Sequence, residues 1–289
     1  MKLSVETYIL RERLGDARGI AAIAAAGFDA VDYSFYWAKE DKDVLGEDYL
    51  ARTHQIRGWI DDAGIVCNQT HTPFELKAGE TFDESNPTFV RLVRSLEASA
   101  ILGADNAIVH RVGAPEGVDE TEYAYGFYKS LQPYCERYGI KVAVENLFQK
   151  KDDKWVGVFG SPEALCGFVR SLDSDCFTAC VDIGHATFAG TPKPEAFLAG
   201  MDAKILKALH VHDNDFTGDQ HQFPWNGRVD WEAVTKSLAD IGYDGDLTYE
   251  IQEFGRYFPN DQKHLVVEYS LKVGKILVDM YEKAKAAKV

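Results

Sequence analysis

Short apolar runs alternate with longer stretches of helical periodicity along the whole chain. The apolar runs predict eight strands, which span residues 2–8, 29–34, 65–71, 105–110, 140–145, 177–182, 205–211 and 246–251. Glycine follows several helical stretches, where a left-handed residue ends a helix at least cost, at Gly27, Gly64, Gly103, Gly139 and Gly242. The first four lie 37, 39 and 36 residues apart, close to one-eighth of the chain. This repeat predicts eight β-then-α units, as in a (β/α)8 TIM barrel.

The expected helix starts carry capping residues. Asn86-Pro87 and Ser161-Pro162 each supply an N-cap followed by proline, and Asp230 precedes a helix that starts at Trp231. Pro192 and Pro194 predict a short helix in the sixth unit. An open, doubly wound sheet would also alternate strands and helices, but no GxGxxG follows the first strand, and polar residues end nearly every strand. We therefore expect an α/β fold in which residues 1–289 form one TIM-barrel domain.

Composition narrows the function classes. The formal net charge of −15 repels a polyanion, so nucleic acid is not the expected partner. The N-terminus lacks the apolar core of a signal peptide, and no apolar run reaches the ~18 residues of a membrane span, which predicts a cytoplasmic protein without a membrane partner. The five cysteines lack CxxC spacing, which predicts reduced thiols. Neither a GxSxG nucleophile nor a GxxxxGK[ST] phosphate loop is present.

Metal-seeking side chains end most of the predicted strands. The last four strands end in Glu145, Asp182, His210 and Glu250, and a barrel would gather these ends at one rim. A carboxylate at the end of an apolar strand is costly to bury unless it is paired, protonated or bound to a metal ion. Each residue alone could be a partly exposed strand end or a member of an ion pair. Together they favour a shared metal site.

The segments around these residues resemble a known family. They read Val144-Glu145-Asn146, Val181-Asp182-Ile183-Gly184-His185, His210-Val211-His212-Asp213 and Tyr249-Glu250. In combination they are similar to the xylose isomerase-like TIM barrels, a superfamily of sugar isomerases and epimerases that includes the apurinic endonucleases. The resemblance implies one divalent metal ion, first Mn²⁺, with Zn²⁺, Co²⁺ or Mg²⁺ as alternatives. The implied metal ligands are Glu145, Asp182, His210 and Glu250. The family pattern is a histidine followed by an aliphatic residue, any residue and an acid. This pattern selects His210 over His212.

The implied activity is that of a metal-dependent isomerase or epimerase of a small sugar or polyol ketone. In that chemistry a proton is abstracted next to a metal-bound carbonyl, and an enediolate forms. Glu145 and Glu250 are the implied catalytic residues, one removing the proton and the other returning it, in an order that the sequence leaves open. His185 is expected to bind a substrate oxygen, unless it is a satisfied loop histidine. A lyase similar to an inosose dehydratase would share the first step, whereas a non-catalytic sugar-binding barrel would not need both glutamates.

Further histidines and one aspartate complicate this picture. Asp219 and His221, two residues apart in a loop, can place two ligands on one cation, and His71 and His110 end the third and fourth strands. Together with His185 and the four strand-end residues, they match in order the ligand pattern of the apurinic endonucleases, whose site holds three metal ions. The resemblance therefore implies an alternative, a zinc-dependent phosphodiester hydrolase with additional Zn²⁺ ions. Short or acidic loops at the strand ends, and sparse basic residues beside the site, count against it.

Loop residues could complete a substrate-binding site. Trp225 stands where the family usually has glycine, and it could stack on the apolar face of a sugar. Four more aromatic residues follow strand ends, where loop packing is the commoner role: Trp37, Phe74, Phe148 and Trp155. The charged run 150–154 predicts a solvated loop. The apolar and aromatic segment 264–281 could pack on the barrel or on a second copy, so a homo-oligomer stays open.

Overall fold

The barrel strands follow one another in sequence order. The computed structural model describes residues 1–36, 44–151, 153–188, 191–251, 254 and 257–288, and its main sheet has eight parallel strands. They are β1 (Leu3–Glu6), β2 (Ala30–Ser34), β3 (Val66–His71), β4 (Asn106–Val109), β5 (Lys141–Glu145), β8 (Phe177–Asp182), β9 (Leu206–His210) and β10 (Leu247–Tyr249). The order in the sheet is β10-β1-β2-β3-β4-β5-β8-β9. Each strand lies inside its expected range, so the strand prediction is confirmed.

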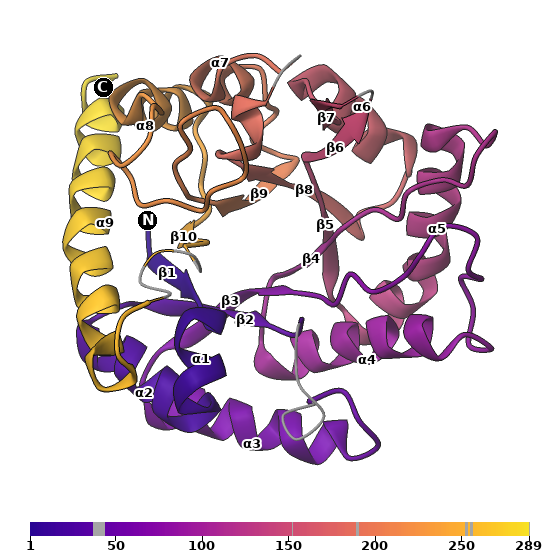
Figure 1. The fold of residues 1–289 in the computed structure, drawn as a ribbon, viewed down its shortest axis with the longest axis horizontal. Coiled ribbons are helices and arrows are strands. Elements are labelled where there is room, and N and C mark those ends of the chain that lie inside the picture. Colours follow the sequence, from indigo (N-terminus) through magenta and orange to yellow (C-terminus); the bar gives the residue numbers. More distant parts are fainter. Residues whose placement is uncertain (37–43, 152, 189–190, 252–253, 255–256, 289) are drawn as a thin grey trace.

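The sheet closes between β9 and β10. Strand β10 pairs with β1, and it meets the end of β9 through a parallel bridge between Val211 and Tyr249. The N–H of Val211 donates to the carbonyl oxygen of Thr248 at 2.8 Å, and the N–H of Glu250 donates to that of Val211 at 3.3 Å. The strands therefore form the ring seen in Figure 1. The predicted TIM barrel is confirmed.

Helices surround the barrel (Figure 1). They are α1 (Tyr8–Leu14), α2 (Asp16–Ala26), α3 (Tyr49–Asp62), α4 (Pro87–Leu102), α5 (Glu120–Tyr138), α6 (Pro162–Ser171), α7 (Pro194–Ala199), α8 (Trp231–Ile241) and α9 (Lys263–Ala286), with short 3₁₀ turns η2 (His185–Thr187) and η3 (Asn260–Gln262). Helix α7 is short, as its prolines predicted. Helix α9 buries one apolar face, which includes Val267 and Leu277, but Tyr269 and Ile276 remain about half exposed. The homo-oligomer therefore stays a prediction.

The helix ends follow the predicted chemistry. Asn86 Oδ1 accepts a hydrogen bond from the N–H of Thr88, and Ser161 and Asp230 cap α6 and α8 in the same way. Gly27, the C-cap of α2, is left-handed with φ 106°, a conformation that glycine adopts without a Cβ clash. These caps satisfy backbone groups that a helix end would leave unpaired. Each helix thus stops where the next strand must start.

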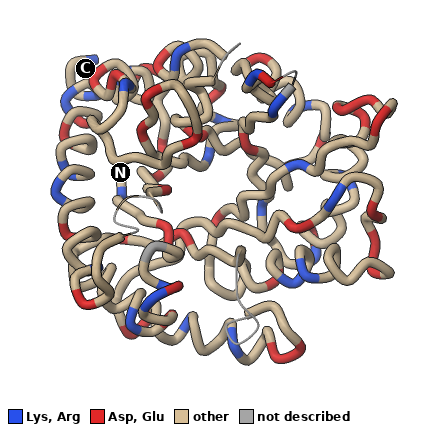
Figure 2. The backbone as a smooth tube through the Cα atoms, in the orientation of Figure 1, with Lys and Arg blue, Asp and Glu red and all other residues tan. Residues whose placement is uncertain are grey.

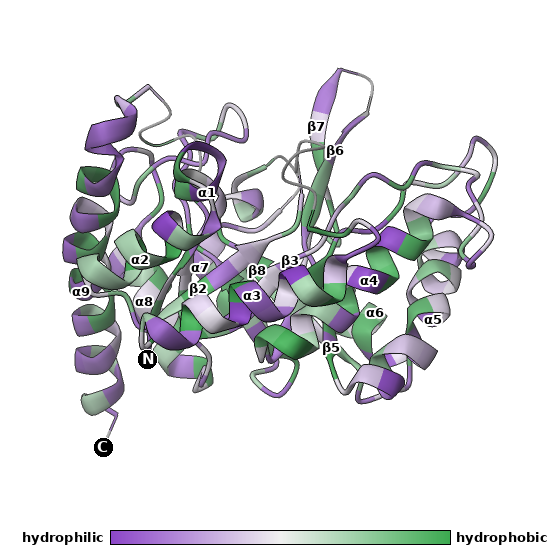
Figure 3. Ribbon diagram, turned by 90° about the horizontal axis from the view of Figure 1, so that it is seen from below, coloured by the Kyte–Doolittle hydropathy of each residue, from purple (hydrophilic) through white to green (hydrophobic). Residues whose placement is uncertain are grey.

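A β-hairpin interrupts the unit after β5. It pairs β6 (Leu147–Lys151) with β7 (Lys154–Val158) as a separate two-stranded antiparallel sheet, and Figure 3 shows it projecting from the barrel. The prediction of a solvated loop over 150–154 is wrong in part, because Lys150 lies in β6 and Lys154 in β7. The strands are joined through Asp153, whose φ of 60° suits a tight hairpin turn. Asp152 lies outside the described residues.

The core lies mainly between the sheet and its helices. Apolar side chains from every barrel strand and most helices form one large buried cluster there. A second, small cluster lies inside the barrel and consists of Ile108, Ala143, Cys180 and Ala208. In Figure 2 most Lys and Arg positions lie on the surrounding helices and loops, whereas acidic positions also occur along the strands. Glu6, Asp32, Glu145 and Asp182 are buried, so part of the negative charge is located inside the molecule.

Two sequence expectations concern cysteines and membranes. All five cysteines are free, and those buried are Cys67, Cys135, Cys166 and Cys180. Burial raises the pKa of Cys67 and Cys180 far above the ordinary value of a thiol, which keeps both protonated and unreactive. Within the part of the chain that the structure describes, no helix has the length and apolarity of a membrane span.

Candidate metal centre

Four strand-end residues meet at one rim of the barrel. Glu145, Asp182 and His210 are the last residues of β5, β8 and β9, and Glu250 directly follows β10. These strands are neighbours in the closed sheet. One ligand atom from each residue lies within 4.8 Å of the others. The barrel thus brings together the four side chains that the resemblance implied as metal ligands.

His210 lies at the centre of this cluster. Its Nδ1 is 3.3 Å from Glu145 Oε1, 3.1 Å from Glu250 Oε2 and 3.9 Å from Asp182 Oδ2. All four side chains are buried, and in the described part of the chain the three carboxylates form ion pairs with histidines. Carboxylates removed from water repel one another and lose hydration, which a bound cation would offset. Carboxylate oxygens with one imidazole nitrogen are ligands that divalent metal ions accept, so the donor set fits the expected ion.

Neighbouring histidines offset part of this negative charge. Burial alone would raise the pKa of Glu145, but His110 and His210 hold it well below its ordinary value. Burial acts on Glu250 in the same direction, and His210 again keeps the pKa low. Burial opposes the charged form of His210, yet the carboxylates of Glu250 and Glu145 raise its pKa well above the ordinary value. Both glutamates are therefore ionised, which is the form that can accept a proton.

His71 and His110 extend the cluster toward β3 and β4. His110 Nε2 lies 2.9 Å from Glu145 Oε2. The ring of His71 stacks on that of His210, with centroids 5.4 Å apart. Burial, and then His110, lowers the pKa of His71 to about 4, so this ring is neutral and can act as a ligand. His71, His110 and Glu145 form a further set of converging ligand atoms.

A second group of ligands lies beside the first. His185, Asp219 and His221, which the sequence singled out, converge with His212. His221 Nε2 is 2.9 Å from Asp219 Oδ2, and His185 Nε2 is 3.7 Å from Asp219 Oδ1. Burial opposes the charged form of His221, but Glu250 and Asp219 raise its pKa to about 10. This group has the donor types that the zinc-dependent alternative requires.

His212 is a member of the site whose place the sequence left undecided. It is fully buried, and its Nε2 lies 2.9 Å from Asp182 Oδ1. Its ring stacks on that of His221 with centroids 4.1 Å apart. His212 therefore links the two groups of candidate ligands. The signal was its two-residue spacing from His210, because alternate residues of a strand point to one face.

Asn146 is a site residue that sequence reasoning missed. Its side-chain N–H donates to the carbonyl oxygen of Asp182 at 2.9 Å, and its Oδ1 accepts from the N–H of Asp182 at 2.7 Å. Its own carbonyl oxygen lies 3.0 Å from His185 Nδ1. This buried clamp fixes the end of β5 against the end of β8, beyond their last paired residues. In the sequence alone, nothing distinguishes a clamping asparagine from an exposed one.

A cavity of about 360 Å³ adjoins the ligands. Both ligand groups contribute to its lining, together with a wall of Tyr36, Phe74, Leu147 and Phe148. The ring of Phe148 lies 4.8 Å from that of His185, and Phe74 stacks on His110 at 5.0 Å between centroids. The polar ligands and the apolar wall thus face the same space, as in pockets that bind small molecules.

Trp225 does not belong to the described residues that line this cavity. It is 48% exposed, with φ 70°, and its N–H donates to Asp213 Oδ2 at 2.9 Å. Its proposed stacking on a sugar therefore stays a prediction. Of the other aromatic residues singled out, Phe74 and Phe148 line the cavity, Trp155 packs on Phe148 at 5.1 Å, and Trp37 lies outside the described residues.

The family follows from a match over most of the chain. A family model described as xylose isomerase-like TIM barrel matches residues 20–269. The chain belongs to this family. The match includes every barrel strand after β1, and with it all the candidate ligands. The resemblance inferred from the sequence is confirmed.

Proteins similar to this xylose isomerase-like chain include one known from its sequence and others with solved structures. An uncharacterised protein of Methanocaldococcus jannaschii is 29% identical over 190 residues. The match covers 62% of this chain and 62% of that relative, so the chain spans less than two thirds of the relative's length. A crystal structure of a D-tagatose 3-epimerase-like protein is 22% identical with a TM-score of 0.75, covering 98% of this chain and 99% of that one. The IolI protein with a bound zinc atom is 16% identical with a TM-score of 0.70, covering 98% and 99%. At these identities the likeness establishes a shared fold.

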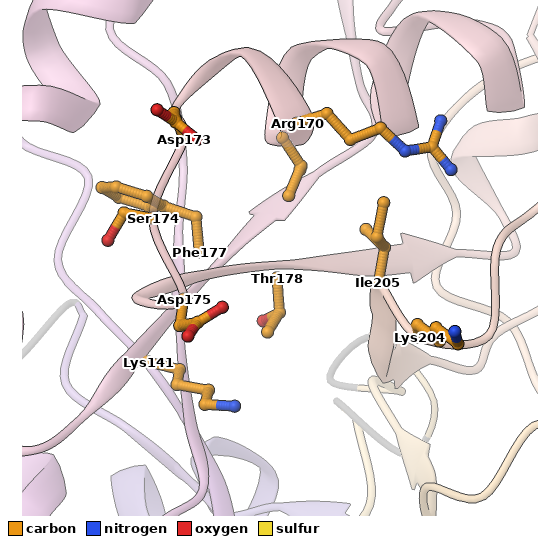
Figure 4. A pocket seen from close by; sticks show the side chains of 10 residues that line it. Lys141, Arg170, Asp173, Ser174, Asp175, Phe177, Thr178, Lys204 and Ile205 are labelled. Atoms are coloured by element: carbon orange, nitrogen blue, oxygen red, sulfur yellow. The ribbon is translucent and has the colours of Figure 1, made fainter.

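This xylose isomerase-like barrel has another cavity at the opposite ends of its strands. It has a volume of about 490 Å³, and Lys141 and Phe177, the first residues of β5 and β8, are in its lining (Figure 4). Arg170 in this lining pairs with Asp202 at 2.7 Å. The lining residues in the described part of the chain form no converging metal-ligand set. Barrel enzymes build their active sites at the carboxyl ends of the strands, which favours the metal centre as the candidate active site.

Proposed function

We propose that the chain is a metal-dependent isomerase or epimerase of a small sugar or polyol ketone. The proposal rests on the placement of Glu145 and Glu250, two buried carboxylates that lie 3.3 Å and 3.1 Å from His210 Nδ1. Both belong to the converging ligand set, and Glu250 also lines the adjoining cavity. Two carboxylates beside one substrate position are what proton removal and proton return require.

The four converging residues would hold the divalent metal ion, and Mn²⁺ is the ion we propose first. When bound, the ion would supply Lewis acidity that stabilises negative charge developing on the substrate oxygens. The support for a metal ion is the chemistry of the donors and the burial of their carboxylates. The zinc atom bound in the IolI structure supports Zn²⁺ as the alternative.

Glu145 and Glu250 would transfer the proton. One glutamate takes the proton from the carbon next to the substrate carbonyl, and the other returns a proton. Return at the opposite face of that carbon would give an epimer. His185 lines the cavity, and its backbone N–H donates to Asp182 Oδ1 at 2.7 Å, which fixes the residue beside the ligands. In this position it would bind a substrate oxygen.

The size and lining of the cavity support a small substrate. A volume of about 360 Å³ lies near the lower end of small-molecule pockets, which span roughly 300–1,000 Å³. Tyr36, Phe74 and Phe148 would pack against C–H groups and keep water from the reacting carbon, while the ligands would bind hydroxyl and carbonyl oxygens. The name of the D-tagatose 3-epimerase-like neighbour supports a sugar as the substrate class.

Exchange of deuterium from solvent tests this function. Purified protein with Mn²⁺ would be incubated in D₂O with a panel of ketoses and polyol ketones, and NMR would follow the C–H next to each carbonyl. We expect exchange in a substrate of this panel, and a loss of about 10²-fold or more in Glu145→Gln and in Glu250→Gln. Asp173→Asn, at the opposite cavity, is the matched control and should retain full exchange. Full exchange in either glutamine variant would contradict the two-base mechanism, and a dehydrated product would identify a lyase.

The second group of ligands favours one further candidate, a zinc-dependent phosphodiester hydrolase. His185, His212, Asp219 and His221 converge as a metal site would require. Elemental mass spectrometry of protein purified without added metal or chelator separates the candidates. About one ion per chain supports the isomerase, whereas about two or three zinc ions per chain support the hydrolase and lead to a cleavage assay on abasic DNA. The formal net charge of −15 counts against DNA as the substrate.

A further inference from the structure

The inside of the barrel is divided into an apolar half and a polar half. On β4, β5, β8 and β9 the interior positions are Ile108, Ala143, Cys180 and Ala208. On β1, β2, β3 and β10 the buried polar residues include Ser4, Asp32, Gln69 and Thr248. Barrel interiors are usually filled by branched apolar side chains. Buried polar groups in half of the interior therefore call for a role.

The polar half is a connected chain of hydrogen bonds. Ser4 Oγ donates to Asn68 Oδ1 at 2.8 Å, and Asn68 Nδ2 donates to Thr248 Oγ1 at 3.1 Å. Thr248 Oγ1 then donates to Gln69 Oε1 at 3.3 Å, and Gln69 Nε2 donates to Asp32 Oδ2 at 2.8 Å. The chain crosses four strands and ends on the carboxylate of Asp32. The hydrogen bond from Gln69 therefore fixes the orientation of the Asp32 carboxylate.

Asp32 faces the ligand His210 from inside the barrel. Asp32 Oδ2 lies 3.5 Å from His210 Nε2, and both side chains are 1% exposed. The other ring nitrogen, Nδ1, faces the carboxylates of Glu145, Glu250 and Asp182. The two nitrogens of one imidazole thus have separate partners, one in the barrel core and one in the metal centre.

This arrangement selects one tautomer of the ring. A nitrogen that binds a metal ion has no proton, so a neutral imidazole that binds through Nδ1 carries its proton on Nε2. Nε2–H needs an acceptor, and Asp32 Oδ2 is the carboxylate oxygen that faces it. We infer that Asp32 is a positioning residue, which holds His210 with Nδ1 directed at the metal ion. The inference rests on the metal centre of the proposed function and assigns a role to the polar half of the interior.

A purely structural role fits Asp32 less well. Its Oδ1 is buried and has no hydrogen-bond partner among the described residues. A buried acceptor without a partner lowers the stability of the fold. A contribution to stability alone therefore does not explain why a carboxylate stands at position 32. Histidine ligands are commonly held by a carboxylate on their second nitrogen, and loss of such a partner weakens metal binding by about 10–100-fold.

Metal binding to Asp32→Asn tests the inference. Asparagine keeps the shape of the side chain and can still accept from Gln69, but it removes the charge that faces Nε2. Protein stripped of metal would be titrated with Mn²⁺ by calorimetry and with Co²⁺ by visible absorption. We expect binding about 10-fold or more weaker and an altered Co²⁺ spectrum, while the unfolding temperature of the stripped protein stays unchanged. Ser34→Ala is the matched control, because Ser34 Oγ donates to Glu6 in the same polar half and makes no contact with His210 among those the structure describes.

The outcomes separate this inference from the proposed function. Wild-type affinity in Asp32→Asn, in protein whose circular dichroism is native, would overturn the role of Asp32 alone. If the wild-type protein binds neither Mn²⁺ nor Co²⁺, the proposed metal centre fails and the inference fails with it. Should Asp32→Asn not fold, Asp32→Ala removes the acceptor with less bulk, and the same titrations apply. Equal weakening in Ser34→Ala would also count against Asp32, because it would indicate a general disturbance of the interior.

Discussion

Gly184 shows how closely the residues of the metal centre are packed. A Cβ added at this position would overlap the ring of His212. That ring is confined between Gly184 and His221, and its Nε2 contacts Asp182. Gly184 has φ −67°, so the need for glycine here comes from space and not from backbone strain. The spacing of Asp182 and His212 therefore depends on the missing side chain.

Gly184→Ala is expected to weaken metal binding by roughly 10-fold, because displacement of His212 moves Asp182. Overpacking should also lower the free energy of unfolding by about 1–3 kcal/mol. Calorimetric titration with Mn²⁺ and urea unfolding would measure the two effects. The control is Gly167→Ala in α6, where a Cβ would meet nothing within 4 Å and alanine favours the helix. If Gly184→Ala binds Mn²⁺ as tightly as Gly167→Ala, the dependence on His212 is refuted.

The sequence predicted which side chains converge at the rim better than it predicted the contacts that hold them there. Glu145, His210 and the other strand-end residues could be found because parallel strands bring their carboxyl ends to one rim. The supports, Asn146 and Asp32, act through contacts between strands that are distant in sequence. Such contacts depend on the closure and register of the whole barrel, which no local pattern encodes. The two-residue spacing of His212 indicated its face but not its burial.

At the scale of elements, the β6–β7 hairpin carries part of the cavity wall. It begins at Leu147, one residue after Asn146, and Leu147 and Phe148 line the cavity. Arg111 Nη2 donates to Gln149 Oε1 at 2.7 Å, and Arg111 also pairs with Glu120 at the start of α5. The hairpin is thus tied to the β4 side of the barrel although its strands pair only with each other.

Phe148→Ala should raise KM. Expressed as free energy, this loss of substrate binding should exceed the loss in the free energy of unfolding. Phe148 lines the cavity, and loss of one aromatic contact with a substrate there costs about 0.5–1.5 kcal/mol, or roughly 2–10-fold in binding. Steady-state kinetics on a substrate from the exchange panel would measure the change. Trp155→Ala removes the partner ring on β7, which does not line the cavity, and should alter KM less. Equal effects of the two variants would show that the wall acts only through hairpin folding.

Elements with strong local signals were predictable, and those that depend on context were not. The barrel strands stand out as apolar runs, and capped helices start at Asn86, Ser161 and Asp230. The hairpin escaped prediction because its tip is charged, and solvated loops carry the same composition. The break between α1 and α2 was also missed, since Gly15 with φ 78° interrupts an otherwise continuous helical pattern.

For the whole molecule, metal binding and folding stability should be linked. Glu145, Asp182 and Glu250 are buried together at one rim, with Asp32 and Glu6 in the interior behind them. Any cation that binds these groups only in the folded state raises the free energy of unfolding by mass action. The ion that we propose would therefore stabilise the folded chain in addition to supplying Lewis acidity.

Removal of metal with a chelator should lower the unfolding temperature. At an Mn²⁺ concentration 100 times Kd the gain is about 2.7 kcal/mol, which corresponds to roughly 5–10 °C in a chain of this size. Differential scanning calorimetry with Mn²⁺ and with chelator would measure the shift. Asp182→Asn, which removes one ligand charge, should show a clearly smaller shift. A wild-type protein with the same unfolding temperature in both conditions would contradict the linkage.

The hairpin has a consequence for how the family could diversify. Its two strands form their own sheet, and the chain leaves and rejoins the barrel at the end of β5 and the start of α6. The segment between Asn146 and Ser161 can therefore change in sequence or length without altering the strand order that places the ligands. One part of the cavity wall and the glutamates proposed for proton transfer therefore lie in separate stretches of chain. Laboratory selection for a new substrate would best randomise this segment and leave the strand ends untouched.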